Sequence, residues 1–359
     1  MTVIKLCLFG DLHLKTNDPL GSMKDGVNTR MLAKLDKLDI IKQIAIENNC
    51  TATVELGDTF DRINPPDTIR NLYATKVRSF LDTGMQYIRI LGNHETTGTD
   101  QGGAGLDTAI LVGKNDLYKV VNTPEFYEFK VAGGPLPFLF IPEVNLDRIN
   151  KALSEFPDTF VLGHFAVEGT QFPNGRTETD GIKRGALAKR PGTLLGHIHN
   201  RQQLFKGKVH YIGAVARADF GDREIDTGVA ILRIDTGKDN AWSVEYVPIP
   251  DVQLLDFRIE EGGTYSDNCF NDFEAGAIIK LTYRGSKAWY MGQDTAGIKG
   301  HILKNGAAKV YIRFQSTDTA MQEVITEKTS LEELIEKKAN VDKQDPTTGL
   351  TILRKANEL

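Results

Sequence analysis

Short apolar runs alternate with longer amphipathic stretches through the first half of the chain. This pattern predicts strand, helix, strand, helix and strand in that order, at residues 3–9, 31–48, 51–56, 67–82 and 86–91. Strands that alternate with helices are typical of an α/β fold built around a parallel sheet. From about residue 120 to residue 249, runs of strand length dominate, so we expect a two-sheet α/β sandwich with helices on its outer faces.

A change of pattern near residue 252 predicts a domain boundary. The segment 260–272 is rich in turn formers and acidic residues. Beyond it, apolar runs at 277–283 and 307–314 flank a glycine-containing amphipathic stretch at 287–304. This order predicts a small α+β domain of the βαβ type.

The end of the chain has a pattern of its own. A capping box begins at Ser330, and Asp345-Pro346 interrupts the helical stretch that follows. We therefore expect a helix–loop–helix that packs on its own domain or docks on a partner protein. The expected domains are 1–252, 253–325 and 326–359.

The composition is that of an ordinary globular protein. Hydrophobic residues make up 40% of the 359 positions and charged residues 25%, with a formal net charge of -5. This balance excludes a disordered chain and a uniformly basic nucleic-acid-binding surface. One local strip between Arg176 and Lys208 has eight basic residues against two acidic ones, which fits a DNA contact or a solvated loop.

Neither a membrane segment nor a disulfide framework is expected. No apolar run reaches the ~20 residues that cross a bilayer, and the N-terminal segment has no small-residue cleavage site, so we expect a cytoplasmic protein. The three cysteines, Cys7, Cys50 and Cys269, lie far apart and form no CxxC pair. We expect them to be reduced core residues.

One local pattern recurs five times: an apolar run, a glycine and then a residue able to bind a metal ion. These residues are, in chain order, Asp11 with His13, Asp58, Asn93 with His94, His164, and His197 with His199. In an open α/β sheet, ligands bind beyond the carboxyl ends of the strands, so we expect the five segments to bring their side chains to one place. His210 and His301 lie outside the pattern and are expected to be structural.

The chemistry of this set favours two metal ions over one. Carboxylates, imidazoles and one amide, without thiolates, suit Mn²⁺, Fe²⁺, Zn²⁺ or Mg²⁺. Even without His94, the seven remaining side chains are too many for one tetrahedral ion. They fit two ions that share a bridging carboxylate, an arrangement that stabilises the attacking and the leaving oxygen of a phosphoryl displacement.

The five segments, GDLHL, GDTFD, GNHE, GHF and GHIH, resemble the signature of the calcineurin-like metallophosphoesterases. Within that family the sequence is most similar to the SbcD-type DNA exonuclease subunit of bacteria and phages. The stretches that carry this likeness are GDTFDRINPP, GHIHNRQQ and VHYIGAVARADFGDRE. Gly213-Ala214 departs from the usual Gly-Ser, which leaves the role of that loop open.

The resemblance implies a role for each residue of the pattern. One ion would be held by Asp11, His13 and His199, and the other by Asn93, His164 and His197, with Asp58 as the bridge. His94 would contact the scissile phosphate, stabilising its growing charge or protonating the leaving 3′ oxygen. Asp61 would orient a metal ligand or cap a turn, and both readings stay open.

The resemblance also implies a function. It indicates a DNA nuclease that uses two divalent ions, with Mn²⁺ as the preferred ion. The nuclease would act in repair, recombination and replication as the nuclease subunit of an SbcCD-like complex. The implied partners are DNA, an SMC-like ATPase subunit of the SbcC type and a second copy of the chain. Two alternatives stay open: a stand-alone phosphatase or cyclic-nucleotide phosphodiesterase, and a non-catalytic scaffold. The extra C-terminal residues argue against the first and the complete ligand set against the second.

Overall fold

A computed structural model describes residues 3–96, 104–130, 134–172, 175–237, 241–263, 270 and 272–318. The chain divides into two compact units, Met1–Gln253 and Leu254–Leu359. The expected helix–loop–helix at 326–359 lies outside the described residues, as does Cys269. Cys7 is buried and unpaired, and Cys50 is half-buried and unpaired.

The first sheet of the N-terminal unit has six strands in the order β14-β13-β1-β4-β5-β6. The strands are β1 (Val3–Phe9), β4 (Ala52–Leu56), β5 (Gln86–Ile90), β6 (Tyr118–Val121), β13 (Gly228–Asp235) and β14 (Ala241–Pro248). Neighbours run parallel from β1 to β6, whereas β13 pairs antiparallel with β1 and with β14. The parallel strands therefore end at one edge of the sheet.

The second sheet also has six strands, in the order β11-β12-β10-β9-β8-β7. The strands are β7 (Glu125–Phe129), β8 (Leu136–Ile141), β9 (Phe160–His164), β10 (Thr193–Gly196), β11 (Gln202–Leu204) and β12 (Val209–Tyr211). Its four central strands are parallel, and β7 and β11 are antiparallel edges.

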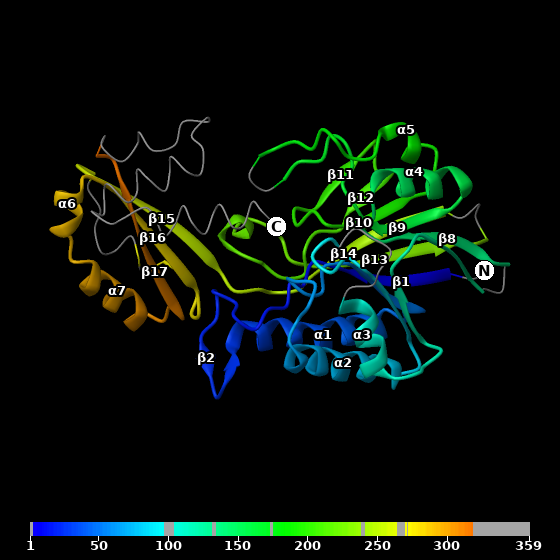
Figure 1. Cartoon of the computed structure of the whole chain (residues 1–359), viewed down its shortest axis with the longest axis horizontal. Helices are drawn as coiled ribbons and strands as arrows, with labels where there is room; N and C mark the ends of the chain where they lie inside the picture. Colours follow the sequence, from blue (N-terminus) through cyan, green and yellow to red (C-terminus); the bar gives the residue numbers. More distant parts are fainter. Residues whose placement is uncertain are drawn as a thin grey trace, which may run out of the picture. The chain divides into compact units, whose positions relative to one another are not determined.

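Helices cover the outer faces of the two sheets (Figure 1). Those packed on the first sheet are α1 (Thr29–Glu47), α2 (Asp67–Leu81) and α3 (Ala104–Val112), and those on the second are α4 (Leu146–Glu155) and α5 (Arg184–Leu187). A third apolar cluster joins the sheets face to face, with Leu8, Val54 and Ile88 against Phe138 and Leu162. The expected two-sheet α/β sandwich is confirmed.

Local capping explains the start of the longest helix. Asn28, the last residue of a short hairpin of β2 (Met23–Lys24) and β3 (Val27–Asn28), accepts hydrogen bonds from the amides of Arg30 and Met31 and so caps α1. This cap starts the helix two residues before the predicted position. The predicted helix at 67–82 corresponds to α2.

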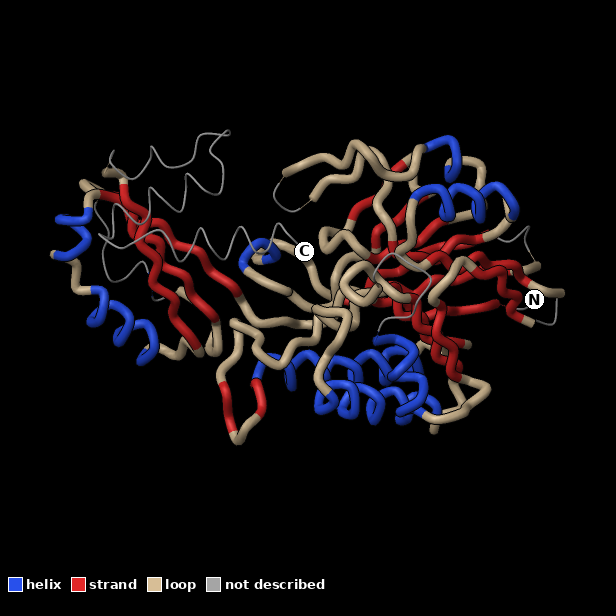
Figure 2. The backbone as a smooth tube through the Cα atoms, in the orientation of Figure 1, coloured by secondary structure: helices blue, strands red, loops and turns tan. Residues whose placement is uncertain are grey.

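The C-terminal unit is a three-stranded parallel sheet in the order β15-β16-β17 with two helices (Figure 2). Its elements are β15 (Leu254–Glu260), β16 (Ile278–Gly285), α6 (Lys287–Met291), α7 (Thr295–Lys304) and β17 (Lys309–Ser316). Its own apolar core includes Ile279, Leu281, Tyr283 and Ile302.

Two details of this unit differ from the sequence prediction. The expected helix at 287–304 is two helices, because α6 ends at Gly292 and Asp294 caps α7 through the amide of Gly297. The strand β15 was not predicted at all. Within the described residues, no helix is both long and apolar enough to cross a membrane.

Candidate metal centre

The five glycine-containing segments follow strands that end at the same edge of the sandwich. Asp11 follows β1 and Asp58 follows β4 in the first sheet, whereas His164 ends β9 and His197 follows β10 in the second. Asn93 and His94 come three and four residues after β5. The side chains of both sheets meet in the crevice beyond the strand ends, as expected for parallel sheets.

Two glycines are required because other residues approach them closely. A Cβ atom on Gly57 would lie 2.2 Å from Nδ1 of His164, and one on Gly92 would lie 2.1 Å from Oδ1 of Asp58. Gly57 also has a φ of +93°. The glycine of the pattern therefore makes room for the candidate ligands of neighbouring segments.

Four residues of the centre adopt left-handed backbone conformations. The φ angles are 56° at Asp11, 47° at His13, 51° at Asp58 and 82° at His197. Hydrogen bonds between segments hold them: the amide of Asp11 donates to the carbonyl of Gly57 (3.0 Å), and that of His13 to the carbonyl of Asp58 (2.9 Å). Such conformations cost about 1–3 kcal/mol each and persist where the surrounding structure imposes them.

The first group of donor atoms comes from Asp11, His13 and His199. One ligand atom of each lies within 4.8 Å of the others. The Nε2 atoms of His13 and His199 are 3.0 Å apart. The amide of His197 donates to Oδ1 of Asp11 (3.1 Å), so the second oxygen of this carboxylate is available to the group.

The second group comes from Asn93, His164 and His197. Oδ1 of Asn93 lies 3.0 Å from Nε2 of His164 and 2.9 Å from Nδ1 of His197. The other nitrogen of His164 contacts the carbonyl of Leu56 at 2.7 Å, which fixes the ring.

Asp58 lies between the two groups. Its Oδ2 is 3.3 Å from Nε2 of His164 and 3.7 Å from Nε2 of His13. The amide of His94 donates to its Oδ1 at 3.0 Å. The same carboxylate oxygen thus faces both donor groups, the position of a bridging ligand.

The donor set fits divalent metal ions. Oδ2 of Asp11 is fully buried and has no hydrogen-bond partner among the described residues, which is costly unless a cation binds it. Burial would lower the pKa of His164, but Asp58 outweighs it and raises the pKa to about 10. Asp222 likewise overcomes burial and raises the pKa of His199 to about 9. The buried carboxylates therefore attract positive charge, which metal ions would supply in place of these protons.

Asp61 and His94 lie at the rim of the centre. Asp61 has Oδ1 3.1 Å from Nδ1 of His13 and Oδ2 3.2 Å from Nζ of Lys15. These contacts fit the orienting role suggested for this carboxylate. The side chain of His94 is 41% exposed, and its Nδ1 is 3.8 Å from Oδ1 of Asp61. One of its nitrogens also lies within ligand distance of His13 and Asp58, so distance alone does not separate it from the ligands.

Sequence reasoning missed one contact of the metal centre. Oδ2 of Asp222, in the short helix η1 (Phe220–Asp222), lies 2.8 Å from Nδ1 of His199 and accepts a hydrogen bond from the amide of Ala218 at 2.8 Å. This carboxylate orients the ring of His199. The only signal in the sequence was the stretch ADFGDRE that contains it.

A buried ionic network behind the centre was also missed. Arg89 in β5 is fully buried and pairs with Glu95, and it donates to Thr59 (2.9 Å) and to Thr108 (2.6 Å). Glu95 accepts hydrogen bonds from the amides of Phe60 (3.0 Å) and Gly92 (3.2 Å). It therefore ties the segment of Asp58 to that of Asn93 and His94.

A solvent-accessible cavity of about 230 Å³ opens above the donor atoms. It is lined by His13, Lys15, Asp58, Asp61, Asn93, His94, His197, His199, Ala218 and Asp219. His210 lies elsewhere and contacts the hydroxyl of Tyr246 at 2.9 Å, as expected for a structural histidine. His301, in the C-terminal unit, lies 3.0 Å from the side-chain nitrogen of Asn305.

Comparison with known proteins identifies the family. The model of the calcineurin-like phosphoesterases matches residues 4–201, more than half of the chain. The chain belongs to this family. The expected resemblance is thereby confirmed. Phosphoesterases are hydrolases, and the clustered His and Asp side chains form a candidate two-metal site.

Two individual proteins show how far the likeness extends. The SbcD polypeptide of the nuclease SbcCD from Bacillus subtilis (strain 168) is 22% identical over 263 residues, which are 62% of this phosphoesterase chain and 66% of that relative. The chain thus spans just under two thirds of the length of this curated relative. The crystal structure of a dimetal phosphatase from Danio rerio matches 64% of this chain and 92% of its own, with a TM-score of 0.42 and 12% identity.

Proposed function

We propose that this chain is a metal-dependent DNA nuclease, the nuclease subunit of an SbcCD-like complex. The observation that carries the proposal is that Asp58 faces both donor groups, with Oδ2 3.3 Å from His164 and 3.7 Å from His13. A phosphoesterase with two ion sites on one bridging carboxylate suits the displacement of a phosphate ester. Exonuclease and endonuclease action both fit this chemistry.

Each group of residues in the centre would have its own role in hydrolysis. Two bound divalent ions, preferably Mn²⁺, would lower the pKa of a water molecule that attacks phosphorus and would offset the charge of the phosphate. Asp11, His13 and His199 would hold one ion, and Asn93, His164 and His197 the other. His94 would donate a hydrogen bond to the phosphate or a proton to the leaving 3′ oxygen, since its exposed ring lines the cavity. Asp61 would hold the ring of His13 in place.

DNA as the substrate rests on the likeness to the SbcD nuclease and less on the basic strip. Arg190 in that strip is 3% exposed and donates to carbonyls such as that of Phe156 (2.7 Å), so it is unavailable to DNA. Lys183 pairs with Glu168 at 2.9 Å. A basic surface supplied by a partner would strengthen the phosphate contacts on which DNA affinity depends.

The proposal includes partners and a setting. An SMC-like ATPase subunit and a second copy of the chain would join it, with the C-terminal unit as a DNA-capping domain and the segment 326–359 as the ATPase contact. The setting would be DNA repair, recombination and replication in the cytoplasm of a bacterium or a phage-infected cell. The 22% identity to the Bacillus subtilis protein supports this assignment.

Hydrolysis by the purified chain tests the proposal. End-labelled duplex DNA, single-stranded DNA and a bis-nitrophenyl phosphate are incubated with Mn²⁺, with Mg²⁺ or with EDTA. We expect Mn²⁺-dependent cleavage of DNA, and none by Asp58→Ala. The matched control is Asp226→Ala, which removes an exposed carboxylate outside the centre. If the small diester is cleaved but DNA is not, even after an SbcC-type ATPase is added, the chain is a small-substrate phosphoesterase. If no ester is hydrolysed, the chain is a scaffold.

A further inference from the structure

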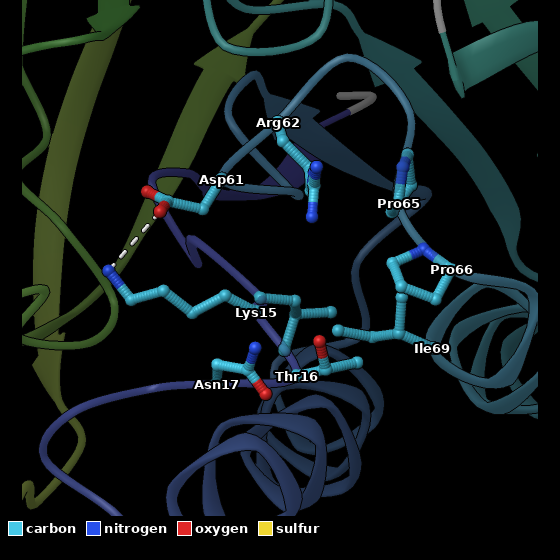
Figure 3. Close-up of a pocket in the computed structure, with 9 residues that line it drawn as sticks. Lys15, Thr16, Asn17, Asp61, Arg62, Pro65, Pro66 and Ile69 are labelled. Carbon is cyan, nitrogen blue, oxygen red and sulfur yellow. Dashed lines mark hydrogen bonds and ion pairs between the residues drawn. The ribbon is translucent and has the colours of Figure 1, made fainter. Parts of the chain in front are cut away.

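A second cavity adjoins the metal centre. Its volume is about 350 Å³, within the range of small-molecule sites. It is lined by Leu14, Lys15, Thr16, Asn17, Asp61, Arg62, Pro65, Pro66 and Ile69 (Figure 3). Lys15 and Asp61 line this cavity and the metal cavity alike, so the two spaces are neighbours.

One wall of the second cavity is cationic and polar. Figure 3 shows the guanidinium of Arg62 pointing into the open space, with the hydroxyl of Thr16 opposite. Among the described residues, Arg62 has no hydrogen-bond or ion-pair partner. Lys15 is already bound to Asp61, with Nζ 3.2 Å from Oδ2, so the charges of that pair offset each other. Arg62 therefore leaves a net positive charge at this wall.

A second side of the cavity, between Arg62 and Thr16 in Figure 3, is apolar and stiff. Pro65 and Pro66 lie side by side at the start of α2, and the buried side chains of Leu14 and Ile69 complete the surface. Proline rings fix the backbone angle and are apolar, and of the two Pro66 is exposed and Pro65 buried. An occupant that matches both walls has an anionic group at one end and a flat, mostly apolar group at the other. A nucleotide has this character.

We propose that the second cavity binds the nucleotide next to the phosphodiester held at the metal centre, with Arg62 on its phosphate and its base or sugar against Pro65 and Pro66. The inference rests on the proposed function, because it makes the cavity part of a binding track for a DNA strand. A small diester would occupy the metal cavity alone. The second cavity thus distinguishes a nucleic-acid strand from a small phosphate ester.

Binding without catalysis tests the cavity by itself. A fluorescein-labelled hexathymidylate is titrated in EDTA with the wild-type chain, Arg62→Ala and Arg233→Ala. Arg233 is an exposed arginine of β13 that lines neither cavity, so its variant is the matched control for charge. Lys15→Ala is avoided because Lys15 also lines the metal cavity. Melting temperatures check that each variant is folded.

Loss of one arginine–phosphate contact has two expected effects. Arg62→Ala should raise the dissociation constant about tenfold. It should also reduce the slope of log affinity against log salt by about 0.7, the value for one phosphate on a single strand. Arg233→Ala should change neither quantity. An unchanged dissociation constant and slope in Arg62→Ala, or no binding by the wild-type chain, would overturn the proposal.

Hydrolysis with Mn²⁺ separates this inference from the proposed function. For Arg62→Ala, kcat/KM on the oligonucleotide should fall about tenfold, whereas kcat/KM on bis-nitrophenyl phosphate should stay within twofold. Equal losses on both substrates would contradict a nucleotide subsite, because Arg62 would then act through the metal centre. If the wild-type chain hydrolyses neither substrate, the proposed function fails, and the binding data alone decide on the cavity.

Discussion

Three of the residues with positive φ in the metal centre directly follow a glycine. Asp11, Asp58 and His197 each turn the chain at the end of a strand, and each side chain then points across the crevice. Aspartate and histidine tolerate the left-handed region better than most residues. The residue types that bind metals are thus also among those that this backbone accepts most readily.

At the scale of single residues, His94 can be separated from the ligands by experiment. His94→Ala should leave two ions bound per chain and lower kcat by about 10²-fold or more, because its ring would act on the phosphate and not on the ions. Metal analysis after gel filtration and steady-state kinetics on a small diester measure both effects. His301→Ala, in the C-terminal unit, is the control. Loss of an ion in His94→Ala would make His94 a ligand.

Asp222 offers a test of the orientation of His199. Asp222→Asn keeps the shape of the side chain but removes the charge that holds the ring through Nδ1. Loss of such a partner costs about 10- to 100-fold in metal affinity. Competition with a fluorescent chelator measures this loss, and Asp226→Asn, at an exposed carboxylate, should show none. Unchanged affinity in Asp222→Asn would mean that the contact does not support metal binding.

The pKa values of two candidate ligands predict how pH affects the centre. In the metal-free chain the pKa is raised to about 10 at His164, where Asp58 outweighs burial, and to about 9 at His199, where Asp222 does. Both rings therefore carry protons at pH 7 and must lose them to bind metal. We expect release of about two protons on metal binding at pH 7, and apparent affinity that rises up to about pH 9–10.

Calorimetry in buffers of different ionisation enthalpy counts these protons. Whereas metal affinity should rise with pH, the free energy of unfolding of the metal-free chain should fall as pH rises. Both folded-state pKa values lie above the ~6.5 of an unfolded histidine. Their stabilising effect is therefore fully present below about pH 6.5 and is lost as pH rises through 9–10. Metal binding without proton release would contradict protonated ligands in the free centre.

The candidate ligands could be picked out in the sequence because each is local to a strand end. A glycine and a metal-binding residue after an apolar run identify Asp58 or His164 without knowledge of their neighbours. Asp222 could not be found in this way, since it lies 23 residues from His199 and only the fold brings them together. Whether Asp61 orients a ligand or caps a turn likewise depends on its contact with His13.

At the scale of elements, Arg89 links the segment after β4 to the segment after β5, which lie far apart in the sequence. The guanidinium pairs with Glu95 in a fully buried position, and it also donates to Thr59. Arg89→Met should lower the free energy of unfolding by about 3–5 kcal/mol, because it leaves a buried carboxylate without its partner. Urea denaturation in EDTA measures this without a contribution from metal binding.

A matched variant sharpens this measurement. Arg233→Met places methionine at an exposed arginine of β13 and should cost less than about 1 kcal/mol. A similar cost for Arg89→Met would show that the network contributes no net stability. The network was not predicted, because an arginine within the apolar run QYIRIL gives no sign of its buried partners.

Helix boundaries in the C-terminal unit show a limit of periodicity. The apolar spacing of 287–304 predicts one helix, but Gly292 ends α6 and Asp294 starts α7 with a side-chain cap. Glycine weakens a helix, yet whether it ends one depends on the packing of each half. Here Trp289 and Tyr290 pack on the sheet core from α6, and Ile302 does so from α7.

At the scale of the whole molecule, three cations fix the end of the N-terminal unit. Asp251 accepts hydrogen bonds from Arg30 (2.6 Å) and from the amide of Arg217 (2.7 Å), and it pairs with Lys37 (3.4 Å). Arg217 also donates to the carbonyl of Val252 at 2.9 Å. The last residues before β15 are therefore part of the phosphoesterase unit.

This anchoring predicts where the chain can be shortened. A truncation to residues 1–253 keeps Asp251 and every candidate metal ligand, so kcat/KM on bis-nitrophenyl phosphate should stay within about threefold of the full chain. A truncation to 1–249 removes Asp251 and leaves Arg30 and Lys37 buried without their carboxylate, which should cost about 3–5 kcal/mol. Thermal unfolding and diester hydrolysis of the two forms measure both effects. Inactivity of a folded 1–253 fragment would show that the C-terminal unit contributes to the metal centre itself.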